Sequence, residues 1–141
     1  MSHDYLSHIR SGSSWLIAHP DDMSRSLSFH TLEAGKFLLD TVCGDIHCGK
    51  DGYMLLYSHS GEGELSYNGQ NYRIPALTIT LVDCSRPYRM RAAPGFSGVW
   101  TYYWMRFDGP GCGFVYETLF SDEYVIFGAE PTRIKEEFDM I

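Results

Sequence analysis

The sequence lacks the long apolar stretches that membrane insertion and secretion require. None of its 141 residues lie in an apolar run approaching the roughly twenty residues of a membrane-spanning helix, and no signal peptide precedes the rest. The cysteines form no C-x-x-C pair, so free thiols in a reducing compartment are favoured over disulfides; they are Cys43, Cys48, Cys84 and Cys112. These absences predict a soluble, cytoplasmic protein without a membrane partner.

Positive charge is also scarce. Eleven Lys and Arg stand against eighteen Asp and Glu, for a net charge of -7. A nucleic-acid-binding domain needs a basic surface to neutralise phosphates, so this chain by itself is not expected to hold DNA.

Catalytic motifs are missing as well. The histidines form neither H-x-H nor H-x-x-x-H, and no Ser/His/Asp set is suggested by their spacing; they are His3, His8, His19, His30, His47 and His59. His59 is interpreted as a surface residue, whereas His47 either lies at the surface or faces a cavity. No covalent chemistry and no cofactor are predicted.

What the sequence does contain is many short strands separated by Gly, Asn and Pro. Residues 52–91 predict a β-meander, and the size of the chain suits one core. Asn68-Gly69 predicts a two-residue type I′ turn, because both central residues of that turn need a positive φ. This turn sets a register that can be checked, in which the facing pairs are Tyr67 and Gln70, Leu65 and Tyr72, and Glu64 and Arg73.

A long aromatic strand is predicted over 98–107. Alternation puts one set of side chains on one face, namely Trp100, Tyr102, Trp104 and Arg106, and another on the opposite face, namely Thr101, Tyr103, Met105 and Phe107. Both faces carry large aromatics, so alternation does not say which face looks inward. The aromatics either line a pocket for a small polyol or sugar, or simply fill a barrel.

The ends of the chain are interpreted differently from its middle. Residues 1–28 predict an arm, either frayed or packed on the body through Trp15. The strand pattern begins near 27–30 and resumes at 36–42, a short helix is predicted over 112–120, and a last strand over 124–127. From Pro131 an apolar stripe runs through Ile134 and Phe138 to the last residue without a capping signal. We therefore expect a fragment cut inside a helix.

Several stretches carry a likeness to a known family. They are Tyr53-Met54-Leu55-Leu56-Tyr57-Ser58-His59-Ser60-Gly61-Glu62-Gly63-Glu64-Leu65, Tyr67-Asn68-Gly69, Tyr72-Arg73-Ile74-Pro75, Leu81-Val82-Asp83-Cys84-Ser85-Arg86-Pro87-Tyr88-Arg89 and Tyr102-Tyr103-Trp104-Met105-Arg106-Phe107-Asp108-Gly109. In order and spacing these resemble the cupin-like N-terminal domain of AraC-type transcription regulators, over roughly residues 30–120.

The resemblance implies an all-β fold, a cupin-type double-stranded β-helix (jelly-roll) barrel over 29–128, that binds a small effector, most simply a sugar or sugar acid. It also implies a homodimer, with 129–141 starting a linker or dimerisation helix. In the family a helix-turn-helix domain follows, which would be the route to DNA. A ligand-free dimerisation barrel remains an alternative.

Cupin enzymes, such as metal-dependent isomerases or dioxygenases, are the other alternative. Carrying their metal motifs over by position puts His47 on the first histidine, Gly49 on the second, Met54 on the glutamate and Tyr88 on the later histidine. One possible ligand falls short of the three or so protein donors of a catalytic metal, so no metal site is predicted. Leu77 stands where these barrels usually turn on a glycine.

By the same resemblance, the effector pocket falls on the aromatic strand, the return strand and two flanking positions, and the arm closes over it. The candidate residues are Thr31, His47, Tyr88, Met90, Tyr102 and Trp104, with Trp100 and Arg106 added by alternation. Arg106 is either an exposed residue at the strand end or a buried guanidinium that would favour a carboxylate or an acidic sugar.

Overall fold

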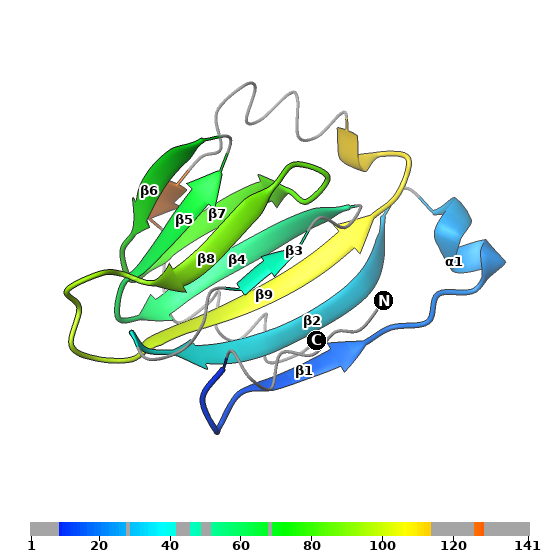
Figure 1. The fold of residues 1–141 in the computed structure, drawn as a ribbon. Coiled ribbons are helices and arrows are strands. Elements are labelled where there is room, and N and C mark those ends of the chain that lie inside the picture. Colours follow the sequence, from blue (N-terminus) through cyan, green and yellow to red (C-terminus); the bar gives the residue numbers. More distant parts are fainter. Residues whose placement is uncertain are drawn as a thin grey trace.

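The computed structural model describes residues 9–27, 29–41, 46–48, 52–67, 69–113 and 126–128. Apart from the short helix α1 (Asp22–Ser26) and the helical residues 112–113 after the last long strand, the regular elements of this part of the chain are strands (Figure 1). The strands are β1 (Ser14–Ile17), β2 (His30–Leu39), β3 (Ile46–Cys48), β4 (Tyr53–Ser60), β5 (Gly63–Tyr67), β6 (Gln70–Ile74), β7 (Thr78–Asp83), β8 (Tyr88–Ala92), β9 (Trp100–Asp108) and β10 (Ile126–Gly128). None of the helices described is long and apolar enough to cross a membrane.

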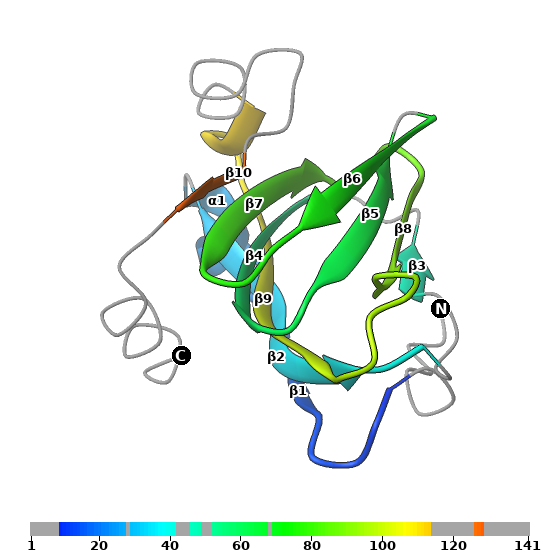
Figure 2. The same ribbon diagram turned by 90° about the vertical axis from the view of Figure 1, so that its left-hand side faces the viewer.

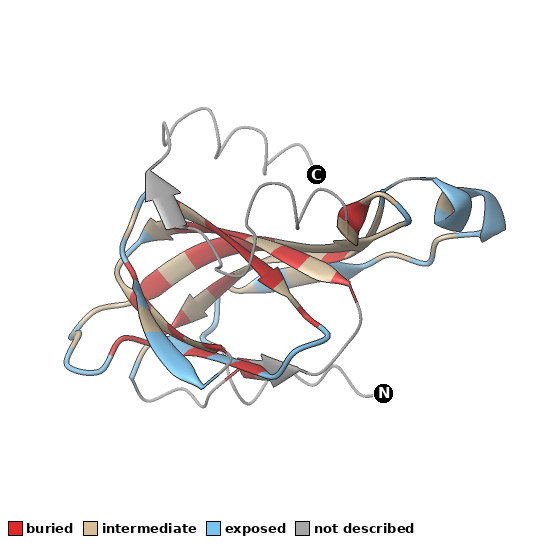
Figure 3. Cartoon of the chain, turned by 90° about the horizontal axis from the view of Figure 1, so that it is seen from above, coloured by how far each residue is buried: buried red, intermediate tan, exposed pale blue. Residues whose placement is uncertain are grey.

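The strands form two antiparallel sheets that face each other. One has the order β1-β2-β9-β4-β7-β10 and the other β3-β8-β5-β6 (Figures 1 and 2). Seen from above, the two layers enclose a core in which buried residues line the inner surfaces (Figure 3). The prediction of an all-β jelly-roll barrel is confirmed. The predicted helices over 112–120 and 131–141 lie outside the described residues from position 114 on.

The β5–β6 hairpin has the register that the Asn-Gly turn predicts. Leu65 pairs with Tyr72 and Glu64 pairs with Arg73 across the ladder. Glu64 and Arg73 do not form an ion pair across this ladder, however, because β8 flanks β5 on its other side and provides another partner for Glu64. Glu64 accepts from the Arg91 guanidinium at 2.6 Å, while Arg73 bonds to Glu62. The turn determines which residues face one another, and the neighbouring strand determines which charges pair.

The inward face of β9 is the one that carries Trp100, Tyr102 and Trp104. These side chains are at most 4% exposed and join one core cluster with residues from both sheets. The opposite face of the six-stranded sheet carries a second aromatic group, where the rings of Tyr57 and Tyr103 stack at 6.5 Å. Burial, with a smaller contribution from Tyr103, raises the pKa of Tyr57. Both faces of β9 are therefore partly buried, which explains why alternation alone did not identify the inner one.

Part of the predicted arm is a sheet strand. β1 pairs antiparallel with β2, with Trp15 opposite Gly35, and the Trp15 ring packs edge-on against Phe37 at 6.2 Å. α1 follows, with its first turn capped by the Asp21 carboxylate, which accepts from the Ser24 amide at 2.8 Å. The two separate strand signals over 27–42 belong to one strand, β2, that contains a β-bulge at Leu32.

The turn between β6 and β7 is strained at Leu77. Its φ is 65°, and its amide donates to the Ser58 carbonyl at 2.6 Å, which holds it there. The left-handed conformation costs a residue with a Cβ about 1–2 kcal/mol. Glycine avoids this strain, but it loses more backbone entropy on folding, which offsets part of the gain. Leu77 is 41% exposed, so little burial is lost on truncation.

We therefore expect Leu77→Gly to raise the free energy of unfolding by about 0.5–1 kcal/mol, measured by urea denaturation. Leu77→Ala is the matched control, because it truncates the side chain and keeps the Cβ. Equal stabilities for the two variants would contradict the assignment of strain to this residue.

Candidate effector-binding site

A cavity lies between the two sheets, on the inner face of β9. Its volume is about 10 Å³, which is room for about one water molecule. The lining side chains come from five strands of both sheets, and they are Glu33, Phe37, Ile46, Met54, Tyr88, Met90, Tyr102, Trp104 and Arg106. The part of the barrel interior that these described residues line is thus nearly filled.

Aromatic rings form one wall of the cavity. Phe37 on β2 meets Trp104 at 5.0 Å and Tyr102 at 5.9 Å between ring centroids, both in edge-to-face geometry. Tyr102 and Trp104 point the same way because they are two residues apart on β9. Gly35 permits the close packing, since a Cβ there would lie 3.0 Å from the Trp104 indole nitrogen and 2.8 Å from the Trp15 Cβ.

The opposite part of the lining is flexible and apolar. Met54 on β4 and Met90 on β8 are at most 3% exposed, and unbranched thioether side chains repack more readily than branched ones. Ile46 pairs with Met90 in the β3–β8 ladder and lies beside it in the lining. Enlargement of the cavity is therefore easiest on this side.

One ion pair supplies the charge at the cavity. The Arg106 Nε donates to the Glu33 Oε1 at 2.9 Å, and the two side chains are only 13% and 1% exposed. They are direct cross-strand neighbours in the β2–β9 ladder. Arg106 thus lies between the two expectations, since its side chain is largely but not fully buried and its Nε is bonded to Glu33.

Alternation along β2 puts Glu33 on the same inner face as Phe37, and the bulge explains why Thr31 does not share that face. Thr31 pairs with Phe107 and Glu33 pairs with Arg106, so Leu32 is an extra residue that shifts the alternation by one. Thr31 consequently lies on the outer face, where its hydroxyl contacts the Met105 sulfur at 3.7 Å. It is outside the cavity lining.

The structure thus brings together Tyr88, Met90, Tyr102, Trp104 and Arg106 of the residues predicted for the pocket. Trp100 lies elsewhere in the core. Its ring is fully buried against Tyr102, and its indole N–H donates to the Ser58 hydroxyl at 2.8 Å. His47 pairs with Arg89 in the β3–β8 ladder, and its side chain lies outside the described part of the chain.

The sequence-based prediction did not include Glu33, Phe37, Ile46 and Met54. Phe37 could have been found, since it is an apolar residue in a predicted strand. Glu33 was missed because it lies between the two predicted strand signals, near 27–30 and over 36–42, so no alternation with Phe37 was available to place it. Met54 was considered only as a possible metal-ligand position.

The metal motif of cupin enzymes can be tested in part against this cavity. Met54 and Tyr88, which take the places of a glutamate and a histidine, both line it, and a thioether and a neutral phenol are poor ligands for a divalent metal. Gly49 lies outside the described residues. Within the part of the chain that is described, no three His, Cys, Asp or Glu side chains gather as a metal site.

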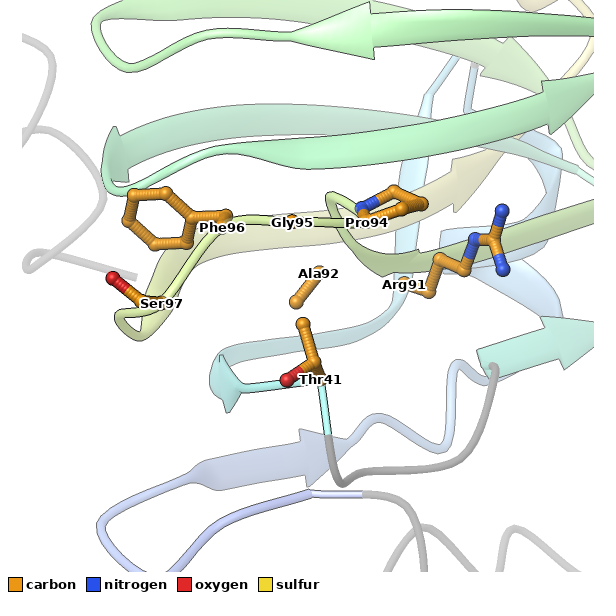
Figure 4. A pocket seen from close by; sticks show the side chains of 7 residues that line it. All are labelled: Thr41, Arg91, Ala92, Pro94, Gly95, Phe96 and Ser97. Atoms are coloured by element: carbon orange, nitrogen blue, oxygen red, sulfur yellow. The ribbon is translucent and has the colours of Figure 1, made fainter.

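A second hollow is more open. It is a groove of about 470 Å³ at the end of β8 and in the loop after it, and it is lined by Thr41, Arg91, Ala92, Pro94, Gly95, Phe96 and Ser97. Figure 4 shows the Phe96 ring and the Arg91 guanidinium at opposite ends of the view. Its volume suits a small ligand, but most of its lining is exposed, and Arg91 already pairs with Glu64.

Comparison with solved structures places the fold among the cupin barrels. The chain is similar to the cupin domain of an XRE family transcriptional regulator from Enterobacter cloacae, with a TM-score of 0.51 and 13% identity over 70% of this chain and 97% of that one. It is also similar to apo ToxT from Vibrio cholerae, with a TM-score of 0.53 and 12% identity over 84% of this chain and 49% of that one.

The sequence comparisons define the class more narrowly. The profile of the AraC-like ligand binding domain matches residues 47–139, about two thirds of the chain. The chain belongs to this family of regulatory ligand-binding domains. It is also 34% identical over 82 residues to the lactose operon transcription activator of Staphylococcus xylosus, which covers 57% of this chain and 29% of that protein. The chain thus spans less than a third of this relative.

Proposed function

We propose that this chain is the effector-sensing part of a transcription regulator, and that its effector is a small hydroxylated molecule, most simply a sugar. The observation that carries the proposal is the cavity on β9, in which an aromatic wall lies beside a largely buried ion pair on the same two strands, β2 and β9. Aromatic rings provide an apolar platform for a sugar ring, and the polar pair provides partners for its hydroxyl groups. The name of the lactose operon relative supports the choice of a sugar.

A sugar does not fit into about 10 Å³, so binding requires the cavity to enlarge. Met54 and Met90 can change rotamer, and Phe37 can transmit a shift to β1, because Trp15 packs against its ring. β1 is an edge strand of four residues, none of them fully buried, and such a strand detaches easily. Binding would in this way alter how the arm is held.

The remainder of the regulator follows as part of the same proposal. A conformational signal of about 1–3 kcal/mol, the usual size of coupling between sites, would reach the dimer partner and a separate helix-turn-helix domain that contacts DNA. The domain would sense and not catalyse. The described residues that line the cavity include no nucleophile with a general base beside it, and Met54 and Tyr88 stand at two positions where cupin enzymes have metal ligands.

Binding is tested by calorimetric titration of the 141-residue chain with lactose and a panel of mono- and disaccharides, supported by thermal shift. We expect at least one sugar to bind, and Trp104→Ala to weaken it about tenfold, the equivalent of about 1.4 kcal/mol. Phe96→Ala in the open groove is the control and should bind as the native chain does. Loss of binding in Phe96→Ala with Trp104→Ala unaffected would move the site to the groove.

A second candidate is a filled barrel that serves only for dimerisation. The small free volume favours it. It would be supported if no sugar in the panel bound while sedimentation showed a stable dimer.

A further inference from the structure

The cavity contains a charge arrangement that bears on which effectors it accepts. The lining contains one acidic and one basic side chain, Glu33 and Arg106, and they are bonded to each other. The pair lies at the edge of the cavity, with Glu33 buried and the Arg106 side chain 13% exposed. We infer that Glu33 is a specificity residue that makes the cavity select neutral polyhydroxylated ligands and reject carboxylates such as uronic acids. This inference rests on the proposed function.

The rejection of acids follows from the position of Glu33. A guanidinium without a partner would bind a ligand carboxylate in a bidentate manner. Here the Arg106 Nε already donates to the Glu33 Oε1 at 2.9 Å, so an incoming carboxylate would lie close to a buried carboxylate and share one cation with it. Two like charges around a single cation in a poorly solvated space repel one another.

The acceptance of neutral ligands follows from the hydrogen-bonding capacity of the pair. A carboxylate offers about four lone-pair positions and a guanidinium five N–H donors, and the bond from Arg106 Nε to Glu33 Oε1 uses one of each. Sugar hydroxyls both donate and accept, so they can bond to Glu33 and to Arg106 without disturbing the charge balance. Hydrogen bonds to charged groups are also stronger than those between neutral groups.

The test compares matched probes that differ only in charge, D-galactose with D-galacturonate and D-glucose with D-glucuronate, by calorimetric titration. The variants are Glu33→Gln, which removes the negative charge of the pair, and the double variant Glu33→Gln/Arg106→Gln, which removes both charges. Glu62→Gln is the control, because Glu62 pairs with Arg73 on the surface. Circular dichroism and thermal melts establish that each variant is folded.

For the native chain we expect the neutral sugar to bind at least tenfold more tightly than its uronate. Glu33→Gln should reverse or erase this preference, the double variant should again discriminate against the uronate, and Glu62→Gln should behave as the native chain. Equal or tighter uronate binding by the native chain, or an unchanged preference in Glu33→Gln, would overturn the inference while leaving sugar sensing intact. Failure of every probe to bind any of the proteins would overturn both.

Discussion

Replacing Gly63 by alanine is expected to lower the free energy of unfolding by about 2–3 kcal/mol, the cost of overpacking a well-filled core. A Cβ at this position would overlap the indole ring of Trp100. The Trp100 ring cannot shift without losing contacts, because it is fully buried and its centroid is 4.3 Å from that of the Tyr102 ring. Its indole N–H also donates to the Ser58 hydroxyl at 2.8 Å. Urea denaturation followed by fluorescence and circular dichroism measures the loss.

Gly113→Ala is the matched control for this variant. A Cβ there would make only an ordinary contact, 3.7 Å from the Tyr53 hydroxyl, so its stability should stay within about 0.5 kcal/mol of the native value. If Gly63→Ala were as stable as Gly113→Ala, the close packing of β5 against Trp100 would be wrong. The position of the inner face of β9 would then also be in question.

Glu33→Leu is expected to have an equally large effect, a loss of about 3 kcal/mol. Removing one member of a buried ion pair leaves the other charge uncompensated, which typically costs about 3–5 kcal/mol, and the 13% exposure of Arg106 favours the lower end. The double variant Glu33→Leu/Arg106→Met should recover most of the loss, because an apolar pair of similar volume is often as stable as a buried ion pair. Chemical denaturation of the native chain, the single variants Glu33→Leu and Arg106→Met, and the double variant completes a double-mutant cycle.

The corresponding substitution in a surface ion pair, Glu62→Leu, provides the comparison for the loss of stability in Glu33→Leu. Arg73 is half exposed in its pair with Glu62, so Glu62→Leu should cost at most about 1 kcal/mol. A loss of that size for Glu33→Leu as well would mean that solvent reaches the Arg106 guanidinium. The charge argument for ligand selection would then lose its basis.

Local features were predictable where one turn or one alternation determines the result. Asn68-Gly69 admits few conformations, so the pairing of Leu65 with Tyr72 could be derived from the sequence. The grouping of Tyr102 with Trp104 on one face follows from the two-residue period of a strand. The family resemblance placed these elements in a cupin barrel, and the comparisons confirm that fold.

The composition of the cavity was only partly predictable. Tyr88, Met90, Tyr102, Trp104 and Arg106 were expected and lie together. The rest depends on how distant segments meet across the two sheets, and those contacts leave no local pattern. Their role in binding an effector stays a prediction until the titrations are done.

The sequence by itself determined the all-β class, the hairpin register and the two sets of side chains on the aromatic strand, because each depends on neighbours along the chain. Only the tertiary structure decided which face of that strand looks inward, since both faces are aromatic and the packing of the second sheet makes the choice. It also decided the partner of Arg106. The bulge at Leu32 puts Thr31 on the outer face while Glu33 lies on the inner face with Phe37, because one extra residue reverses the alternation on one side of it relative to the other.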